Sequence, residues 1–257
     1  MLAALCIVES SLRETAGFEV LGIFLIFWGY MASEMPIHSK LITAAGRSIL
    51  RPLGLFQKGR SRTWLDDHAW WTCVVEFQPS TWGCGSYLNV GCMWLWKVKN
   101  YISFDEGYRV EPFSGFAGEV QFDAEARRLA ERAAEEVRRY RSLFPNISRV
   151  CEFYLERPPL NGGHWWNFHS AIACGLAGRP VDAVRFFDCF LHGQVNGPEW
   201  LIAARADTEK LKTQVAETIE FRRAISARVR RTREMQRLPA LAEIDFDATF
   251  PSKGVLE

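Results

Sequence analysis

The segment 56–65 carries the clearest chemical signal in the sequence, because three cations stand two residues apart in it. Lys58, Arg60 and Arg62 would all project from one face of a β-strand, with Trp64 nearby. Ammonium and guanidinium groups gathered in this way can hold an anion, and guanidinium groups do so through paired hydrogen bonds. We therefore predict a basic ridge on one face of a sheet.

Two amides in the neighbouring predicted strands extend this signal. Gln78 and Asn89 are poor strand formers that stand among Val, Phe and Leu residues, so their presence needs a reason. We predict that they share a face with the basic ridge and that their amide groups form hydrogen bonds that select the shape of a bound ligand. The alternative is an ordinary solvated sheet face, on which the ridge makes salt bridges to Asp66, Asp67 and Glu76.

A second basic region lies in the last predicted helix, where arginines crowd the segment from Arg222 to Arg237. Such a density of cations can bind RNA, DNA or another phosphate-rich surface. The competing interpretation is a solvated helix face whose cations favour the negative end of the helix dipole. No aromatic residue is interleaved for base stacking after Phe221, which favours the solvated face over a nucleic-acid partner.

The histidines of the segment GGHWWNFH do not complete a catalytic site. His164 and His169 are five residues apart, which on a helix turns the second side chain away from the first and excludes a shared metal ion. The sequence also lacks G-x-S-x-G, P-loop and dinucleotide-binding patterns. We expect no catalytic residue, no metal site and no cofactor. In an enzyme, the ridge would stabilise charge and His164 or Glu76 would carry the proton.

The composition and charge of the chain are those of an ordinary soluble globular protein. Its 257 residues are 48% hydrophobic and 24% charged, enough for one large or two small domains. The net charge of +1 gives no global attraction to nucleic acid or to acidic membranes. The seven cysteines include no C-x-x-C pair, which favours buried thiols in a reducing compartment over disulfides or zinc. We therefore expect a cytoplasmic protein.

Residues 1–34 differ from the rest of the chain. The apolar run 20–32 has thirteen residues, whereas a membrane-spanning helix needs about 20. The acidic residues before it are also unlike the basic front of a secretory signal. We expect residues 1–34 to be a hydrophobic extension outside the folded domain, either a loosely attached tail or an over-extended reading frame before a working start at Met31 or Met35. A membrane or export segment involving residues 18–32 and an ordinary buried helix are the alternatives.

The elements that must position these side chains are predicted to form an α+β fold. Alternating apolar and polar residues predict an antiparallel meander of three to five strands, with turns at Asp66-Asp67 and at residues 79–86. A helix should precede the sheet, and a short edge strand should end it. The predicted ranges are 37–53 for the helix, 56–65, 69–78 and 87–96 for the strands, and 108–113 for the edge strand.

The C-terminal half is predicted to be helical. Apolar spacing and breakers indicate helices over 123–144 and 147–155, a helical hairpin over 166–177 and 181–191, and a last helix over 198–237 with a break. The hairpin resembles one tetratricopeptide-like unit, which cannot bury its own apolar face. We divide the chain into an α+β domain over 35–157, a helical region over 158–238 and an irregular tail over 239–257.

Three strings suggest a family. FQKGRSRTW, VVEFQPS and SYLNVG resemble the pattern of domain-of-unknown-function family 4304, over residues 37–156. The matching positions are Lys58, Arg62, Trp64, Gln78, Ser80, Asn89 and Gly91. The resemblance implies a bacterial, cytoplasmic α+β domain and carries no established activity.

The function that these observations favour is non-enzymatic recognition of a protein or an anionic ligand through the polar sheet face. Immunity to a toxin and assembly in a defence system are consistent with this role, but no residue selects them. The alternative is an enzyme acting on a phosphorylated or nucleic-acid substrate. Both hypotheses require Lys58, Arg62, Gln78 and Asn89 to emerge on one side of the sheet.

Overall fold

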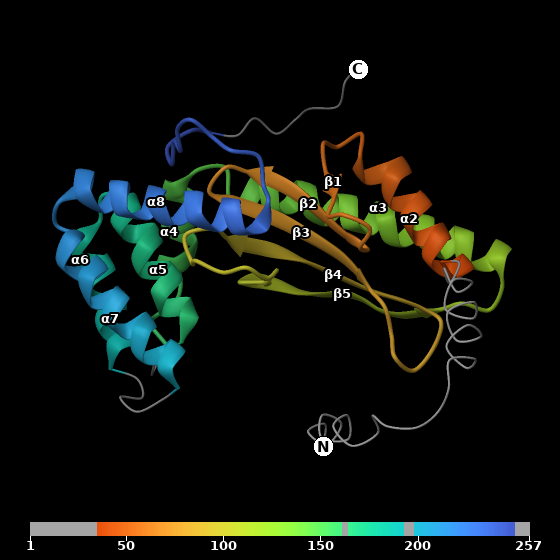
Figure 1. Ribbon diagram of the computed structural model, residues 1–257, viewed down its shortest axis with the longest axis horizontal. Helices are drawn as coiled ribbons and strands as arrows, with labels where there is room; N and C mark the ends of the chain where they lie inside the picture. Colours follow the sequence, from red (N-terminus) through yellow and green to blue (C-terminus); the bar gives the residue numbers. More distant parts are fainter. Residues whose placement is uncertain (1–34, 161–163, 193–197, 250–257) are drawn as a thin grey trace, which may run out of the picture. The chain divides into compact units, whose positions relative to one another are not determined.

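The described part of the chain is built around one antiparallel sheet (Figure 1). The computed structural model describes residues 35–160, 164–192 and 198–249. Within these residues, five strands follow one another across the sheet in chain order. They are β1 (Phe56–Gln57), β2 (Thr63–His68), β3 (Trp71–Gln78), β4 (Gly85–Trp94) and β5 (Glu106–Gly115).

Helices precede and follow this sheet, so the predicted α+β fold is confirmed. Helices α4 to α7 gather beyond one end of the strands (Figure 1). The helices are α2 (Ile37–Leu50), α3 (Glu119–Leu143), α4 (Ile147–Leu155), α5 (Trp165–Leu176), α6 (Pro180–Leu191), α7 (Glu199–Gln214) and α8 (Thr218–Gln236). The predicted helix 147–155 agrees at both ends, and α5 and α6 form the predicted hairpin. The allowed break in the last helix separates α7 from α8.

The predicted first strand, 56–65, is wrong in its middle. Lys58 to Arg62 form the turn between β1 and β2, in which Gly59 has a φ of +59° and the Ser61 hydroxyl donates to the Lys58 carbonyl at 2.7 Å. Glycine adopts this left-handed conformation without strain, and a serine hydroxyl can bond to the local backbone in place of a strand partner. The turn therefore removes the strand on which the basic ridge depended.

The predicted turn at Asp66-Asp67 is also wrong, because both aspartates lie inside β2. Each carboxylate is bound by an arginine: Arg141 of α3 donates to both oxygens of Asp66 at 2.8 Å, and Arg233 of α8 donates to both oxygens of Asp67 at 2.7 Å. Adjacent strand residues point to opposite faces, so α3 and α8 reach β2 from opposite sides of the sheet. The chain reverses instead at Ala69, whose φ is +63°.

A stack of indole rings joins the sheet to the helices. Trp94 at the end of β4 lies 4.8 Å from Trp96 and 6.0 Å from Trp70, measured between ring centroids, and the rings are nearly parallel. All three side chains are fully buried. The Trp94 indole nitrogen donates to the hydroxyl of Tyr154 in α4 at 2.8 Å. Aromatic contacts and a buried hydrogen bond thus tie β4 to the helical half.

The described residues from Ile37 onward form one compact unit. Among the residues that the structure describes, no helix is both long and apolar enough to cross a membrane. The predicted extension 1–34, with its apolar segment 18–32, lies outside the described residues, as do residues 250–257 of the predicted tail.

We expect Gly46→Ala to destabilise the protein. A Cβ atom at Gly46 in α2 would lie 2.8 Å from the indole nitrogen of Trp64, which is buried beneath the helix. Helix propensity alone would favour alanine by about 1 kcal/mol. Overpacking against a rigid ring costs about 1–3 kcal/mol, so the free energy of unfolding in guanidinium should fall. Gly118→Ala is the matched control, because no atom within 4 Å would meet its Cβ. A stabilised Gly46→Ala variant would contradict this packing.

Candidate functional site

The connection between β4 and β5 places one lysine in the interior. The Lys99 side chain is 1% exposed, and its ammonium group donates to the Ser103 hydroxyl and to the Asp105 carboxylate, both at 2.6 Å. Burial alone would raise the pKa of Asp105, but the nearby His169, the Lys99 ammonium group and a hydrogen bond from the Trp94 amide lower it. The aspartate therefore stays ionised, and the ion pair fixes the course of this connection.

His169 of α5 closes the same buried cluster. Its Nδ1 atom accepts a hydrogen bond from the Trp96 indole at 3.0 Å, which puts the proton of the neutral ring on Nε2. Nε2 faces Asp105 Oδ1 at 3.7 Å. Burial lowers the pKa of His169 to about 3, so the ring is neutral at physiological pH. His164, the other predicted histidine, is exposed at the N-cap of α5. The two histidines therefore do not meet in one site.

The neighbouring lysine, Lys97, points into a cavity. Its ammonium nitrogen lies 3.4 Å from the centroid of the Trp165 ring, a cation–π contact. Within the described residues, Lys97 makes no ion pair with a carboxylate. Burial and, to a lesser degree, the charge of Lys99 lower its pKa to about 8, although the charge of Asp105 acts in the opposite direction. Lys97 is thus a partly desolvated cation that no carboxylate of the described residues contacts directly.

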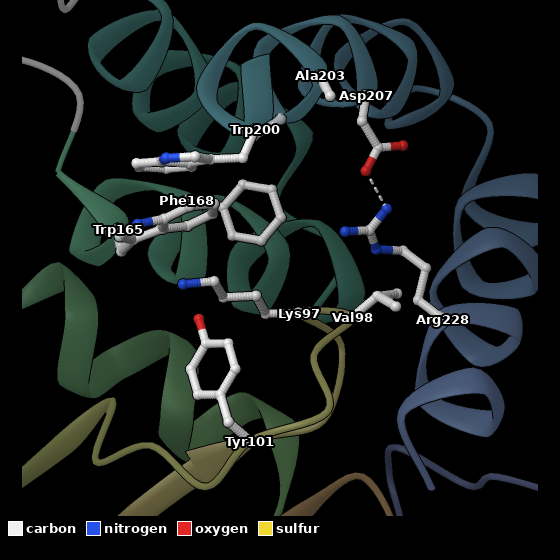
Figure 2. A pocket seen from close by; sticks show the side chains of 10 residues that line it. Lys97, Val98, Tyr101, Trp165, Phe168, Trp200, Ala203, Asp207 and Arg228 are labelled. Carbon is white, nitrogen blue, oxygen red and sulfur yellow. Dashed lines mark hydrogen bonds and ion pairs between the residues drawn. The ribbon is translucent and has the colours of Figure 1, made fainter. Parts of the chain in front are cut away.

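Aromatic side chains form much of the cavity wall (Figure 2). The cavity has a volume of about 680 Å³, within the range that small-molecule sites occupy. The rings of Trp165 and Trp200 are nearly parallel, with centroids 6.5 Å apart. In Figure 2 the hydroxyl of Tyr101 points toward the Lys97 ammonium group. The lining residues are Lys97, Val98, Tyr101, Trp165, Phe168, Trp200, Ala203, Ala204, Asp207 and Arg228.

The opposite wall carries a second cation that is already neutralised. Arg228 of α8 forms an ion pair with Asp207 of α7, and its Nε donates to the Trp96 carbonyl oxygen at 2.8 Å. These bonds hold α7 and α8 against the end of β4. Lys97 therefore remains the cation of this cavity that has no acidic partner among the described residues.

A second cavity, of about 430 Å³, contains a carboxyl group that gains protons easily. Glu106 lines it together with Tyr108, Arg139 and other residues. The Tyr154 hydroxyl donates to Glu106 Oε1 at 2.8 Å. Burial nevertheless raises the pKa of Glu106 to about 7. A group that titrates near neutral pH can exchange protons, but the described residues that line this cavity include no cysteine, serine or histidine beside it.

The structure brings together two of the predicted site residues, Gln78 and Asn89. The Asn89 amide donates to Gln78 Oε1 and to Glu76 Oε2, both at 2.9 Å. Arg109 of β5, which the sequence analysis did not single out, donates to Gln78 Oε1 at 2.9 Å and stacks over Tyr87. These groups form a network on one sheet face in which the side chains bond mainly to one another.

The other predicted residues do not join that network. Lys58 donates to Gln236 of α8, whereas Arg62 donates to the carbonyl of Gly85 and to the Ser39 hydroxyl of α2. The side chains of Lys58 and Arg62 thus contact different helices. The prediction that Lys58, Arg62, Gln78 and Asn89 share one surface was therefore wrong, because the turn before β2 redirects the cations.

Trp64 and Ser80 are likewise separate from the network. Trp64 is 1% exposed and packs beneath α2, so its predicted contact with a ligand was wrong. Ser80 lies in the turn between β3 and β4, where its hydroxyl accepts a hydrogen bond from the Trp82 amide at 3.1 Å.

The arginines of α8 are largely occupied by carboxylates. Arg233 is buried against Asp67, and four other arginines of the segment pair with acids. The pairs are Arg222–Asp247, Arg223–Glu220, Arg228–Asp207, Arg231–Glu234 and Arg233–Asp67. Their charges are therefore partly neutralised within the protein, which weakens the predicted attraction to nucleic acid. In the described ranges, no group of three or more His, Cys, Asp or Glu side chains could hold a metal ion.

The cavity residues escaped the sequence analysis because they come from four separate segments. Lys97 and Lys99 stand two residues apart, a spacing that in a strand would place both side chains on one face, so it gives no sign that Lys97 faces a cavity and Lys99 the interior. No local pattern places Trp165 and Trp200 beside Lys97 either.

Comparison with protein-family models, curated proteins and solved structures finds no match for this chain. The resemblance to family 4304 accordingly stays a prediction from short motifs.

We expect Glu106→Gln to change how stability depends on pH. The pKa of Glu106 is about 7 in the folded protein and near its ordinary value of 4.5 when unfolded. Between these values the folded state binds more protons, so stability falls as pH rises through that window. The glutamine variant lacks this term and keeps an acceptor for Tyr154.

Urea denaturation of both proteins from pH 4 to pH 8 measures this effect. The variant should gain stability relative to the wild type as the pH rises. The measurement at pH 4 is the internal control, because the glutamate is mostly protonated there in both the folded and the unfolded state. A constant difference across the range would contradict the raised pKa.

Proposed function

We propose that this protein is a binding module for a small organic anion with a flat apolar body, which it holds in the cavity beside Lys97. One observation carries the proposal: the Lys97 ammonium group lies 3.4 Å from the Trp165 ring, inside an aromatic cavity, without a carboxylate partner among the described residues.

The unpaired ammonium group favours an anionic ligand. Removing a cation from water without a counter-ion is unfavourable, and the lowered pKa of Lys97 expresses that penalty. A carboxylate or phosphate in the cavity would supply the missing counter-ion at a site where the local dielectric strengthens the attraction. Such a ligand would stabilise the charged form of Lys97, so binding should be accompanied by proton uptake near pH 8.

The wall favours a flat apolar body. Trp200 and Tyr101 are 59% and 55% exposed, so water covers large ring surfaces in the free protein. A planar ligand that covers them would gain about 25 cal/mol for each Å² of apolar surface removed from water. The nearly parallel rings of Trp165 and Trp200 offer flat faces for stacking.

Binding is favoured over the enzyme alternative by the separation of the groups that catalysis would need. Lys58 and Arg62 are engaged with different helices, and Glu76 is bonded to Asn89. None of these three residues lines the Lys97 cavity. The alternative also assigned proton transfer to His164, which is exposed at the start of α5.

Recognition of a protein through the sheet face of Gln78 and Asn89 is a second candidate. It is supported by Trp82, which is 95% exposed in the turn between β3 and β4, and by the exposed Arg109 of β5. Tryptophan and arginine are enriched in the central contacts of protein interfaces.

A cytoplasmic location fits either role. The cysteines that the structure describes are all free, and Cys73, Cys92, Cys151 and Cys174 are buried. Free, buried thiols are typical of proteins from reducing compartments.

A ligand panel tests the proposed binding. It contains aromatic carboxylates, aryl phosphates and the neutral amide of each carboxylate, and it is read by thermal shift and by quenching of tryptophan fluorescence. Anionic members should stabilise the protein, by about 2.7 kcal/mol at 100 times the dissociation constant. Lys97→Met should weaken their binding by about tenfold or more, equivalent to about 1.4 kcal/mol, because it removes the charge and keeps most of the side-chain length.

Two matched controls separate the cavity from general effects. Lys210→Met removes an exposed lysine of α7 that does not line the cavity, and it should leave binding unchanged. Trp200→Ala should weaken binding, whereas Trp82→Ala should not. Equal affinity for the anions and their amides would contradict the proposed function, and so would a panel in which no member binds measurably.

A further inference from the structure

The Lys97 cavity contains a primary amine whose surroundings suit covalent chemistry as well as binding. We propose that Lys97 forms a reversible imine with the carbonyl group of an aromatic 2-oxo acid held in this cavity. The inference rests on the proposed function and adds to it a substrate class: a ligand that carries a ketone next to its carboxylate.

Three features of the structure leave the Lys97 amine free to react. It lies at the cavity surface instead of in the sealed interior, where Lys99 is fixed by Asp105. No carboxylate among the described residues holds it as an ammonium ion through an ion pair. Its contact with Trp165 uses the face of a ring, which does not accept a proton. An approaching carbonyl carbon therefore has access to the nitrogen lone pair once the proton has left.

The fraction of Lys97 side chains that carry a neutral amine also favours the reaction. With a pKa of about 8, roughly one Lys97 side chain in ten is uncharged at pH 7. An ordinary lysine, with a pKa near 10.4, is uncharged in only about one molecule in 2,500 at that pH. Lysines that serve as nucleophiles are activated in this way, by desolvation and by a neighbouring cation, and here the cation is Lys99.

The reaction balances without a redox partner. The neutral Nζ atom attacks the carbonyl carbon, a nitrogen–carbon bond forms, and the carbonyl π electrons move to the oxygen, which takes up one of the two protons of the nitrogen. The resulting carbinolamine loses its hydroxyl group and the remaining nitrogen proton as water, leaving a carbon–nitrogen double bond. Hydrolysis reverses each step.

Tyr101 is placed to carry the proton. Its hydroxyl points toward Lys97 in Figure 2, and the side chain is exposed enough to exchange protons with water. The cavity wall of Trp165 and Trp200 would hold the aromatic ring of the ligand, while the protonated imine would attract its carboxylate.

Reductive trapping tests this inference on the full chain. The protein is incubated with phenylpyruvate and sodium cyanoborohydride, and the adducts are located by mass spectrometry of peptides. Lys97 should be labelled about tenfold or more above the exposed Lys210, because more of its amine is neutral. Buried Lys99 should stay unlabelled. Phenylacetate, which lacks the ketone, should compete at Lys97 and leave the labelling of Lys210 unchanged.

The outcomes distinguish the covalent step from the binding. Labelling of Lys97 that phenylacetate suppresses and that Lys97→Arg abolishes supports the imine. Phenylacetate binding that depends on Lys97, without trapping of phenylpyruvate at Lys97, would overturn the imine and leave the proposed function standing. Failure of both acids to bind would overturn both. Tyr101→Phe should slow trapping by a larger factor than it weakens phenylacetate binding, because it keeps the ring of the cavity wall and removes the hydroxyl, and an unchanged trapping rate would remove Tyr101 from the proton transfer.

Discussion

The buried ion pair between Lys99 and Asp105 fixes the chain between β4 and β5, and the candidate site depends on it. The ammonium group of Lys99 is enclosed by Asp105 and Ser103, so this lysine faces the interior. Lys97, two residues earlier, is left to face the aromatic cavity. Removing either partner of a buried pair leaves an uncompensated charge at a cost of about 3–5 kcal/mol, so the connection has little freedom to rearrange. The ion pair of Lys99 with Asp105 therefore helps to determine where the Lys97 amine lies.

The cavity lies where the end of the sheet meets the helical half, and several elements hold it there. The stacked rings of Trp94 and Trp96 extend the hydrophobic core from β4 to α4 and α5. Arg228 of α8 binds both the Trp96 carbonyl and Asp207 of α7, which draws the two last helices to the same point. The site therefore requires the sheet and the C-terminal helices together, and neither half contains it alone.

The sequence predicted those features that depend on local patterns. Apolar spacing located α4 and the α5–α6 hairpin, and alternation located β3 and β4, whose antiparallel register places Gln78 near Asn89. In the segment 58–62 two local patterns compete: the alternating cations predict a strand, whereas Gly59 and Ser61 favour the turn that the protein forms. The Lys97 cavity is not visible in the sequence for a different reason: its walls come from four segments between residues 97 and 228, whose proximity is set by tertiary packing.

The ionisation of Lys97 tests the central claim most directly. Nuclear magnetic resonance can follow the side-chain ε-methylene signals of the lysines as the pH changes, with Lys97→Arg identifying the signal of Lys97. We predict a midpoint at about pH 8 for Lys97, together with a chemical shift displaced by the Trp165 ring. A midpoint near 10.4, the ordinary value for a lysine in water, would contradict the account, because the amine would then be solvated and not held in an aromatic cavity.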